Sequence, residues 1–306
     1  MNEHSKSLAL EIANCSNVSA ALKDPRHPCR KVVAWQATQL PILTGASDYT
    51  DTCAHRPEGW TGTLESAPIM FLASNPSFDP LEAYPDWTSD WPTERLLPFA
   101  TDRFGASEAR PFGATDDADP DRTYRTDTSL SRRVNHWAIV RHLAATTLGR
   151  DVSEVSARDD YVMTELVHCK SFNEVGVPDA LTTCAATWLD KIFRVSPAKI
   201  VFVLGVKPAK HLVELIPTIP ETWGAWSVSG QKRGDWPSTR DELVQRTATG
   251  SWGPAQQRKH TTTLTLGGRE RTFVWLPRGG SSIPWSLWAD PPVVDSSVIA
   301  EWRSVL

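Results

Sequence analysis

Residues 67–77 read APIMFLASNPS, a stretch that combines an apolar run with an abrupt polar turn. The first seven residues are almost wholly apolar, which is typical of a strand covered on both faces in a parallel sheet. Ser74, Asn75 and Pro76 follow at once, and all three favour turns. Because open α/β sheets bind ligands at the carboxyl ends of their strands, this turn is a candidate site. An ordinary strand-ending turn is the alternative interpretation.

The elements predicted beyond this turn alternate between strands and helices, the order that right-handed parallel crossovers produce. Apolar runs predict the strands, and apolar positions three and four residues apart predict the helices. The expected strands are residues 67–73, 161–167, 199–204 and 271–276. The expected helices are residues 8–22, 134–148, 179–195, 208–215 and 293–306. This order favours the α/β class.

Two segments without lasting periodicity interrupt this order, at about residues 79–130 and 217–262. The first is rich in Pro and Asp and is predicted to be a long ordered loop or lid, with residues 116–121 its most mobile part. The second contains four tryptophans. A chain of 306 residues with 40% hydrophobic content can form one large domain, so we expect a single domain, 1–306, with these two insertions.

Charge, apolar runs and cysteines limit the class of protein. The chain has no run of 18 apolar residues and a polar N-terminus, which predicts a cytoplasmic protein with no membrane partner. Its five cysteines then indicate thiols or metal ligands, not a disulfide framework. The net charge of −4 excludes a uniformly basic surface, but residues 191–278 hold 14 bases and 6 acids. That segment is either a solvated basic face or a surface that meets phosphates.

Three segments at the carboxyl ends of predicted strands resemble the motifs of the uracil-DNA glycosylase superfamily. They are ASNPS (73–77), TELVHCKS (164–171) followed by CAATWLDKIFRVSPAKIVFVLG (184–205), and LPRGGSS (276–282). The resemblance covers about residues 65–78 and 160–290. It implies a three-layer α/β/α fold with a central parallel four-stranded sheet, and a monomer that binds DNA. It also implies hydrolysis of the N-glycosidic bond of a flipped-out base, which leaves an abasic site.

The resemblance implies catalytic roles for Asn75, Glu165 and Arg278. Asn75 matches the residue that positions the attacking water, and an amide suits orientation better than proton abstraction. Glu165 stands where the superfamily has a base-reading Asn, and Arg278 where it has a His that helps the base leave. The expected base pocket adds Ser74, Ser77 and an aromatic side chain from Phe78, Tyr84, Phe104 or Trp87.

The Glu165 departure from the superfamily pattern favours a cytosine-type base, either plain or modified. An ionised Glu165 has only acceptors and matches the N4 amino group of cytosine; a protonated one donates to N3. A Glu165 that merely pairs with Lys170 or Arg278 is the alternative. Arg278 is permanently charged and suits either the leaving base or a phosphate.

The expected DNA-binding residues lie at a helix start and after the last strand. Lys207 begins a helix, where backbone donors attract phosphate. Gly279 and Gly280 permit close backbone approach, and Ser281 and Ser282 can bond phosphate oxygens. A wedge that fills the gap left by the flipped nucleotide is expected from Trp285 and its neighbours Ile283, Pro284 and Leu287, for which ordinary packing is the alternative.

Four cysteines suggest a cofactor that the hydrolysis itself does not require. Cys169 and Cys184, 15 residues apart, resemble the second cysteine pair of iron–sulfur members of the superfamily. Cys15 and Cys29, 14 residues apart, would complete the ligands of a [4Fe–4S] cluster. Buried reduced thiols are one alternative, and a zinc site that uses His27 or His168 is another.

Three functions remain open at this point. The first is a glycosylase for a modified cytosine-type base, which would serve defence against phage DNA. The second is excision repair of uracil or other deaminated bases. The third is an inactive nucleic-acid-binding module, which would create no abasic sites.

Overall fold

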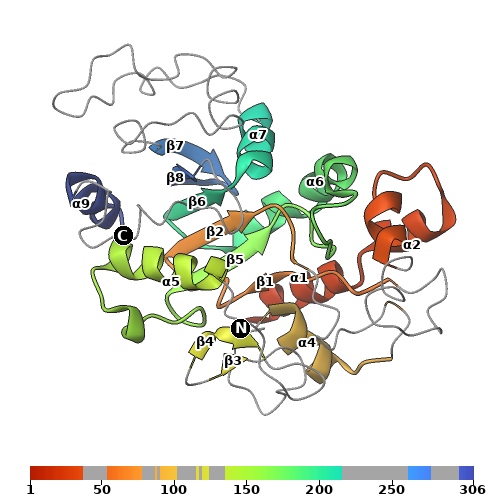
Figure 1. Ribbon diagram of the computed structural model, residues 1–306, viewed down its shortest axis with the longest axis horizontal. Helices are drawn as coiled ribbons and strands as arrows, with labels where there is room; N and C mark the ends of the chain where they lie inside the picture. The colour runs from red at the N-terminus through yellow and green to blue at the C-terminus, as the bar shows by residue number, and fades with distance from the viewer. Residues whose placement is uncertain are drawn as a thin grey trace.

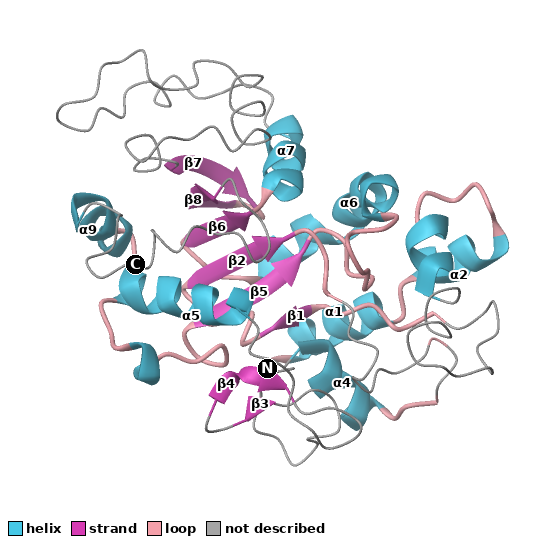
Figure 2. Ribbon diagram, in the orientation of Figure 1, coloured by secondary structure: helices cyan, strands magenta, loops and turns pink. Residues whose placement is uncertain are grey.

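The protein is described by a computed structural model (Figures 1 and 2), which covers the following residues. They are residues 1–36, 54–77, 87, 90–101, 115–116, 119–123, 135–215, 261–276 and 296–306.

A mixed sheet forms the centre of the described part, with the strand order β1-β5-β2-β6-β8-β7 (Figure 2). Its strands are β1 (Trp60–Thr61), β2 (Ile69–Ala73), β5 (Tyr161–Glu165), β6 (Ile200–Leu204), β7 (Thr261–Leu266) and β8 (Arg269–Leu276). The four central strands β5, β2, β6 and β8 run parallel. β1 and β7 pair antiparallel at the two edges. The α/β class and the parallel centre are therefore as expected, and the two antiparallel edge strands were not predicted.

Helices cover both faces of the sheet and give three layers (Figure 1). One face packs on α5 (Asn135–Leu148) and α9 (Ser296–Ser304), and the other on α1 (Glu3–Ala13), α2 (Ser16–Lys23), α4 (Thr93–Thr101), α6 (Val177–Val195) and α7 (Val206–Leu215). A short 3-10 helix, η2 (Val152–Glu154), follows α5. Successive side chains of β2 point to opposite faces of the sheet, so this strand contacts both helical layers. Phe71 stacks on Phe202 on the face of α5 and α9, whereas Met70 and Leu72 lie on the face of α1 and α6.

Two predicted segments differ from the structure. The N-terminal helix is broken into α1 and α2 at Asn14, whose side chain and backbone N–H both donate to the Leu10 carbonyl and end α1. The first insertion is not wholly irregular: α4 packs against α1, and β3 (Thr115–Asp116) pairs with β4 (Asp119–Thr123). The prediction of one long loop over 79–130 is therefore wrong for these parts. The second insertion lies almost wholly outside the described residues.

Buried polar groups surround the segment that follows β5. The Lys170 ammonium is fully buried and contacts the Glu58 carboxylate. Glu58 is also held by its backbone, because its N–H donates to the His168 carbonyl and its own carbonyl lies 2.6 Å from His168 Nδ1. Gln36 bridges the Lys170 carbonyl and the His55 N–H. These contacts fix the segment against the loop that precedes β1.

The free energy of unfolding is expected to decrease as pH falls, because two buried histidines remain neutral in the folded state. Burial lowers the pKa of His168 and His55 to about 3, and for His55 the Lys170 charge adds to this effect. Glu58 and Lys170 are the charged groups that face them. Unfolded histidine takes up a proton below its ordinary pKa of about 6.5, so stability present at neutral pH is lost as pH falls towards 3. We expect a loss of about 2 kcal/mol for each histidine between about pH 7 and pH 5.

Urea unfolding at several pH values measures this loss. His168→Gln should reduce the pH dependence of the free energy of unfolding, whereas His4→Gln, at an exposed position, should not. An unchanged dependence in His168→Gln would contradict the expectation.

Candidate active site

The carboxyl ends of β2, β5 and β6 bring a polar cluster to one edge of the sheet. β2 and β5 are in register, with Ala73 opposite Glu165, and their pairing continues as Val167 N–H donates to the Ser74 carbonyl. Ser171 N–H then donates to the Pro76 carbonyl. The ASNPS turn is therefore held along the whole segment that follows β5.

Asn75 is held in one amide orientation. Its Nδ2 donates to the Pro76 carbonyl at 2.8 Å and lies 3.3 Å from the Ser171 carbonyl. Both partners accept only, so the nitrogen faces them and Oδ1 points the other way. Oδ1 lies 3.3 Å from Ser74 Oγ. The amide oxygen is thus presented as an acceptor at the sheet edge.

Ser74 joins this turn to a carboxylate that sequence reasoning missed. Ser74 Oγ donates to Glu174 Oε1 at 2.6 Å, which is far shorter than its contact with Asn75. A hydroxyl has one proton, so this bond leaves Asn75 Oδ1 available to another donor. The second oxygen of Glu174 contacts the Lys207 ammonium. An acidic residue in the loop after a central strand was the available signal, because such loops share the edge of the sheet with the ASNPS turn.

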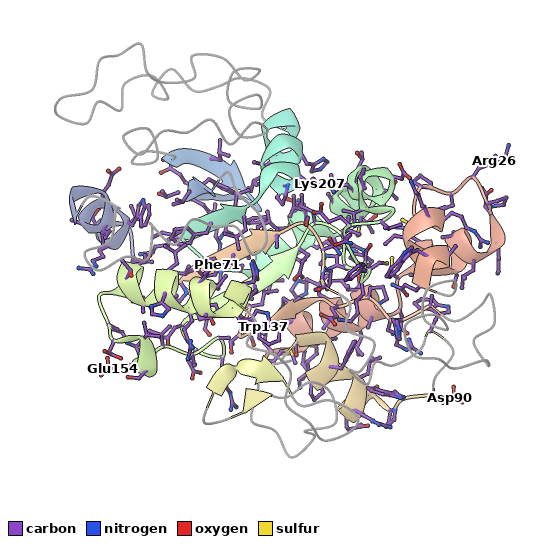
Figure 3. The ribbon with its side chains drawn as sticks, in the orientation of Figure 1. Arg26, Phe71, Asp90, Trp137, Glu154 and Lys207 are labelled. Atoms are coloured by element: carbon purple, nitrogen blue, oxygen red, sulfur yellow. The ribbon has the colours of Figure 1, made fainter. Side chains whose placement is uncertain are left out.

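Lys207 lies beside this cluster, as expected from its place after β6, but its charge already has a partner. It is the second residue of α7, and Figure 3 shows it where that helix begins. Its side chain and that of Glu174 are 34% and 38% exposed, so the pair is half-buried. Lys207 therefore links α7 to the loop after β5, and any phosphate would meet it together with a carboxylate.

The loop at residues 171–176 has an unusual backbone. Asn173 and Glu174 have φ of 51° and 58°, a region that residues with side chains rarely adopt. Ser171 Oγ donates to the Val175 carbonyl at 2.8 Å and closes the loop. Gly176, with φ of 76°, ends it against residues 30–36, because a Cβ there would lie 2.3 Å from Val32 N. Such strain persists where surrounding contacts fix it and is common at functional sites.

The structure brings Asn75, Ser74 and Glu165 to the same sheet edge. Glu165 is half-buried and follows Tyr161 and Met163 in alternation, so it lies on the face that α5 covers. Lys170, one of its two suggested partners, contacts Glu58 instead. Ser77 is exposed.

Several predicted residues cannot be compared with the structure. Arg278, Phe78, Tyr84, Phe104, Gly279, Gly280, Ser281, Ser282, Trp285 and the other wedge candidates lie outside the described residues. Trp87 is described, and it is a packing residue: it packs against the larger buried core, and the Arg56 guanidinium lies 5.6 Å from its ring centre. The suggestion that Trp87 stacks on a base is therefore not favoured.

The four predicted cysteines lie around one cavity between α2 and α6. Cys15, Cys29, Cys169 and Cys184 all line it and are all free thiols. The cavity has a volume of about 10 Å³, roughly the room that one water molecule needs. The two pairs, far apart in sequence, thus line the same cavity, an arrangement that buried reduced thiols and a bound cluster would both give.

Burial favours the neutral form of Cys29, Cys169 and Cys184. Burial raises the pKa of Cys29 to about 11 and that of Cys184 to about 12, and the His168 N–H opposes the rise at Cys184. Burial, followed by the neighbouring thiols, raises the pKa of Cys169 well above its ordinary value. Four thiolates here would need a cationic group between them, and their ionisation would release protons on binding.

The four cysteines line one small cavity, but within the described ranges no group of three or more His, Cys, Asp or Glu side chains is arranged to hold a metal ion. His27 Nδ1 accepts from Cys29 N–H at 3.1 Å, and His168 Nδ1 faces the Glu58 carbonyl. A tetrahedral zinc site needs sulfurs about 4 Å apart around a Zn–S length of about 2.3 Å. The four thiols match the ligands of a [4Fe–4S] cluster and also those of a four-cysteine zinc site, so the donor set suits either group.

Comparison with known families and with curated proteins gives no match for this chain. The helices in the described ranges are all too short or too polar to span a lipid bilayer.

Proposed function

We propose that this protein is a DNA glycosylase of the uracil-DNA glycosylase type that removes a cytosine-type, modified base from a flipped-out nucleotide. It acts as a monomer in the cytoplasm, and defence against phage DNA with modified bases is the role it would serve. The main support is the arrangement of Asn75, whose amide oxygen is presented as an acceptor at the carboxyl edge of four parallel strands. The order of the ASNPS, TELVHCKS and LPRGGSS segments adds to this support.

In the proposed reaction, Asn75 Oδ1 orients a water for attack on C1′ of the sugar. Orientation of a reactant by a fixed group can contribute several orders of magnitude to the rate. Ser74 and Glu174 hold the turn, and the Glu174 carboxylate brings negative charge near the sugar, where positive charge develops as the bond breaks. Lys207 balances that carboxylate in the free protein. Arg278 is proposed to stabilise the departing base.

Glu165 is proposed to read the base. It is the last residue of β5, lies opposite Ala73, and is half-buried where the four residues before it are buried. A carboxylate accepts from the N4 amino group of cytosine and has no donor for the O4 of uracil. The site therefore favours a cytosine-type base.

Substitution of Glu165 is expected to change base preference. Glu165→Asn restores an amide and should shift preference towards uracil, and Glu165→Gln should weaken any step that needs a carboxyl group. A mismatched bond to a buried base edge should change selectivity by about tenfold to a hundredfold. Competition between uracil and modified-cytosine DNAs measures it. A wild type that prefers uracil over every cytosine derivative, with Glu165→Asn unchanged, would contradict base reading by Glu165.

The four cysteines are proposed to hold a [4Fe–4S] cluster. When bound, the cluster would supply a structural link among Cys15 before α2, Cys29, the segment after β5 and α6, and no step of the hydrolysis uses it. Cys169 lies two residues before Ser171, whose carbonyl contacts the Asn75 amide. The cluster would therefore support the segment that orients Asn75.

Anaerobically purified protein should be brown, with broad absorbance near about 400 nm. Cys184→Ser should lower iron content and thermal stability together, because it removes one ligand of the group that links the helices. Cys53→Ser, which changes the fifth cysteine, is the matched control. A stable, active preparation that contains no iron, or contains zinc instead, would contradict the cluster.

The reaction is tested with DNAs that contain uracil, hypoxanthine, 5-hydroxymethylcytosine or glucosylated 5-hydroxymethylcytosine. Alkali cleaves DNA at abasic sites, so excision appears as strand breaks. We expect breaks with a modified-cytosine DNA for the wild type and far fewer for Asn75→Ala. Binding of DNA without breaks in any substrate would favour the inactive binding module.

A further inference from the structure

The loop after β5 presents an aromatic ring to solvent beside the proposed catalytic turn. Phe172 is 49% exposed, and Met1 is the other exposed large apolar side chain of the described residues. The neighbouring Ser171 contacts Asn75 through its carbonyl and the Pro76 carbonyl through its N–H. The ring therefore projects from a residue adjacent to one that holds Asn75.

The ring is carried by a fixed loop. The two residues after it have positive φ, and Glu174 bonds both Ser74 and Lys207. Ser171 Oγ closes the loop on the Val175 carbonyl. Because this backbone is already fixed by several contacts, the loop loses little further conformational entropy when the Phe172 side chain binds a ligand.

We propose that Phe172 stacks on a nucleobase of the DNA strand that flanks the flipped-out nucleotide. This inference rests on the proposed glycosylase function and adds a residue that positions the substrate strand. An exposed phenyl ring held rigidly at a nucleic-acid site suits base stacking, which tolerates any base because each has a π face. The residue is about half exposed, so its side chain is accessible for this contact.

The stacking contact is tested by photochemical cross-linking, which does not depend on excision. The probe is a short DNA in which a tetrahydrofuran abasic analogue lies between two 5-iodouracils. Ultraviolet light breaks the carbon–iodine bond, and the base couples to an aromatic ring stacked on it. Mass spectrometry of the tryptic peptide at residues 171–191 should place the adduct on Phe172.

Variants at position 172 supply the controls. Phe172→Ala should abolish the adduct and raise the Kd for the abasic DNA about tenfold or more, and Phe172→Trp should retain both. Phe172→Leu keeps an apolar side chain but should lose the adduct. The unfolding temperature should stay unchanged in all three, because the ring is exposed.

The outcomes separate this inference from the proposed reaction. A wild type that excises bases but gives no Phe172 adduct, with Phe172→Ala binding equally well, overturns the stacking role alone. An adduct at Phe172 without excision of any base overturns the reaction alone. A protein that does not bind the abasic DNA overturns both.

Discussion

Asn75→Ala is expected to lower the rate of base excision at least about a hundredfold while the protein remains folded. The substitution removes the amide oxygen that would orient the water, and it removes two contacts to the Pro76 and Ser171 carbonyls. Pro76 and Ser171 are buried, but the Pro76 carbonyl keeps the Ser171 N–H as a donor, so the lost hydrogen bonds should cost about 1–3 kcal/mol of stability. Single-turnover measurement of excision, with saturating protein, separates the chemical step from binding.

Ser7→Ala is the control for this substitution. Ser7 lies in α1, its side chain is exposed, and it belongs to no part of the proposed site. We expect excision close to the wild-type rate for Ser7→Ala. Equal rates in Asn75→Ala and wild type would remove Asn75 from the mechanism.

Lys170→Met is expected to destabilise the protein by roughly 3–5 kcal/mol, because it removes the ammonium that contacts a buried carboxylate. Both side chains are almost inaccessible, at 0% for Lys170 and 7% for Glu58. Burial lowers the pKa of Lys170 well below its ordinary value, and the Glu58 carboxylate opposes that effect. Urea unfolding at neutral pH measures the change.

Two further variants show whether burial causes the effect. Lys170→Met with Glu58→Gln should recover much of the lost stability, because no buried charge remains. Lys6→Met removes the exposed partner of Glu3 and should change stability by no more than about 1 kcal/mol. A Lys170→Met protein as stable as Lys6→Met would contradict the importance of the buried pair.

The apolar runs were sufficient to predict the central strands. The run before Ser74 and the IVFVL run of β6 are buried on both faces, so their sequences carry no alternation that could mislead. β1 could not be predicted, because its two residues are a strand only through pairing with β5. β7 carried a signal that was not used: Gly267 and Gly268 join β7 to β8 with φ of 60° and 73°, the backbone of a two-residue hairpin turn.

The position of a site residue could be predicted from the sequence where the residue lies at the end of a strand. It was less predictable where the conformation of a loop determines that position. Asn75 and Glu165 follow apolar strands directly, so their place at the sheet edge follows from the strand assignment. Glu174 reaches Ser74 only because its backbone has positive φ, which its sequence does not indicate. The two cysteine pairs were suggested by their spacing, but the break between α1 and α2 that places Cys15 depends on Asn14.

Sequences descended from this one should tolerate substitutions in the segment between β5 and α6 but not a change in its length. Cys169, Lys170 and Ser171 are consecutive, yet they contact the thiol cavity, Glu58 and Asn75 respectively. Inserting or deleting one residue before them would move these groups, two side chains and one backbone carbonyl, away from their partners, as a one-residue slip does in a strand. Descendants of this sequence, natural or engineered, are therefore expected to keep the same number of residues between Glu165 and Gly176.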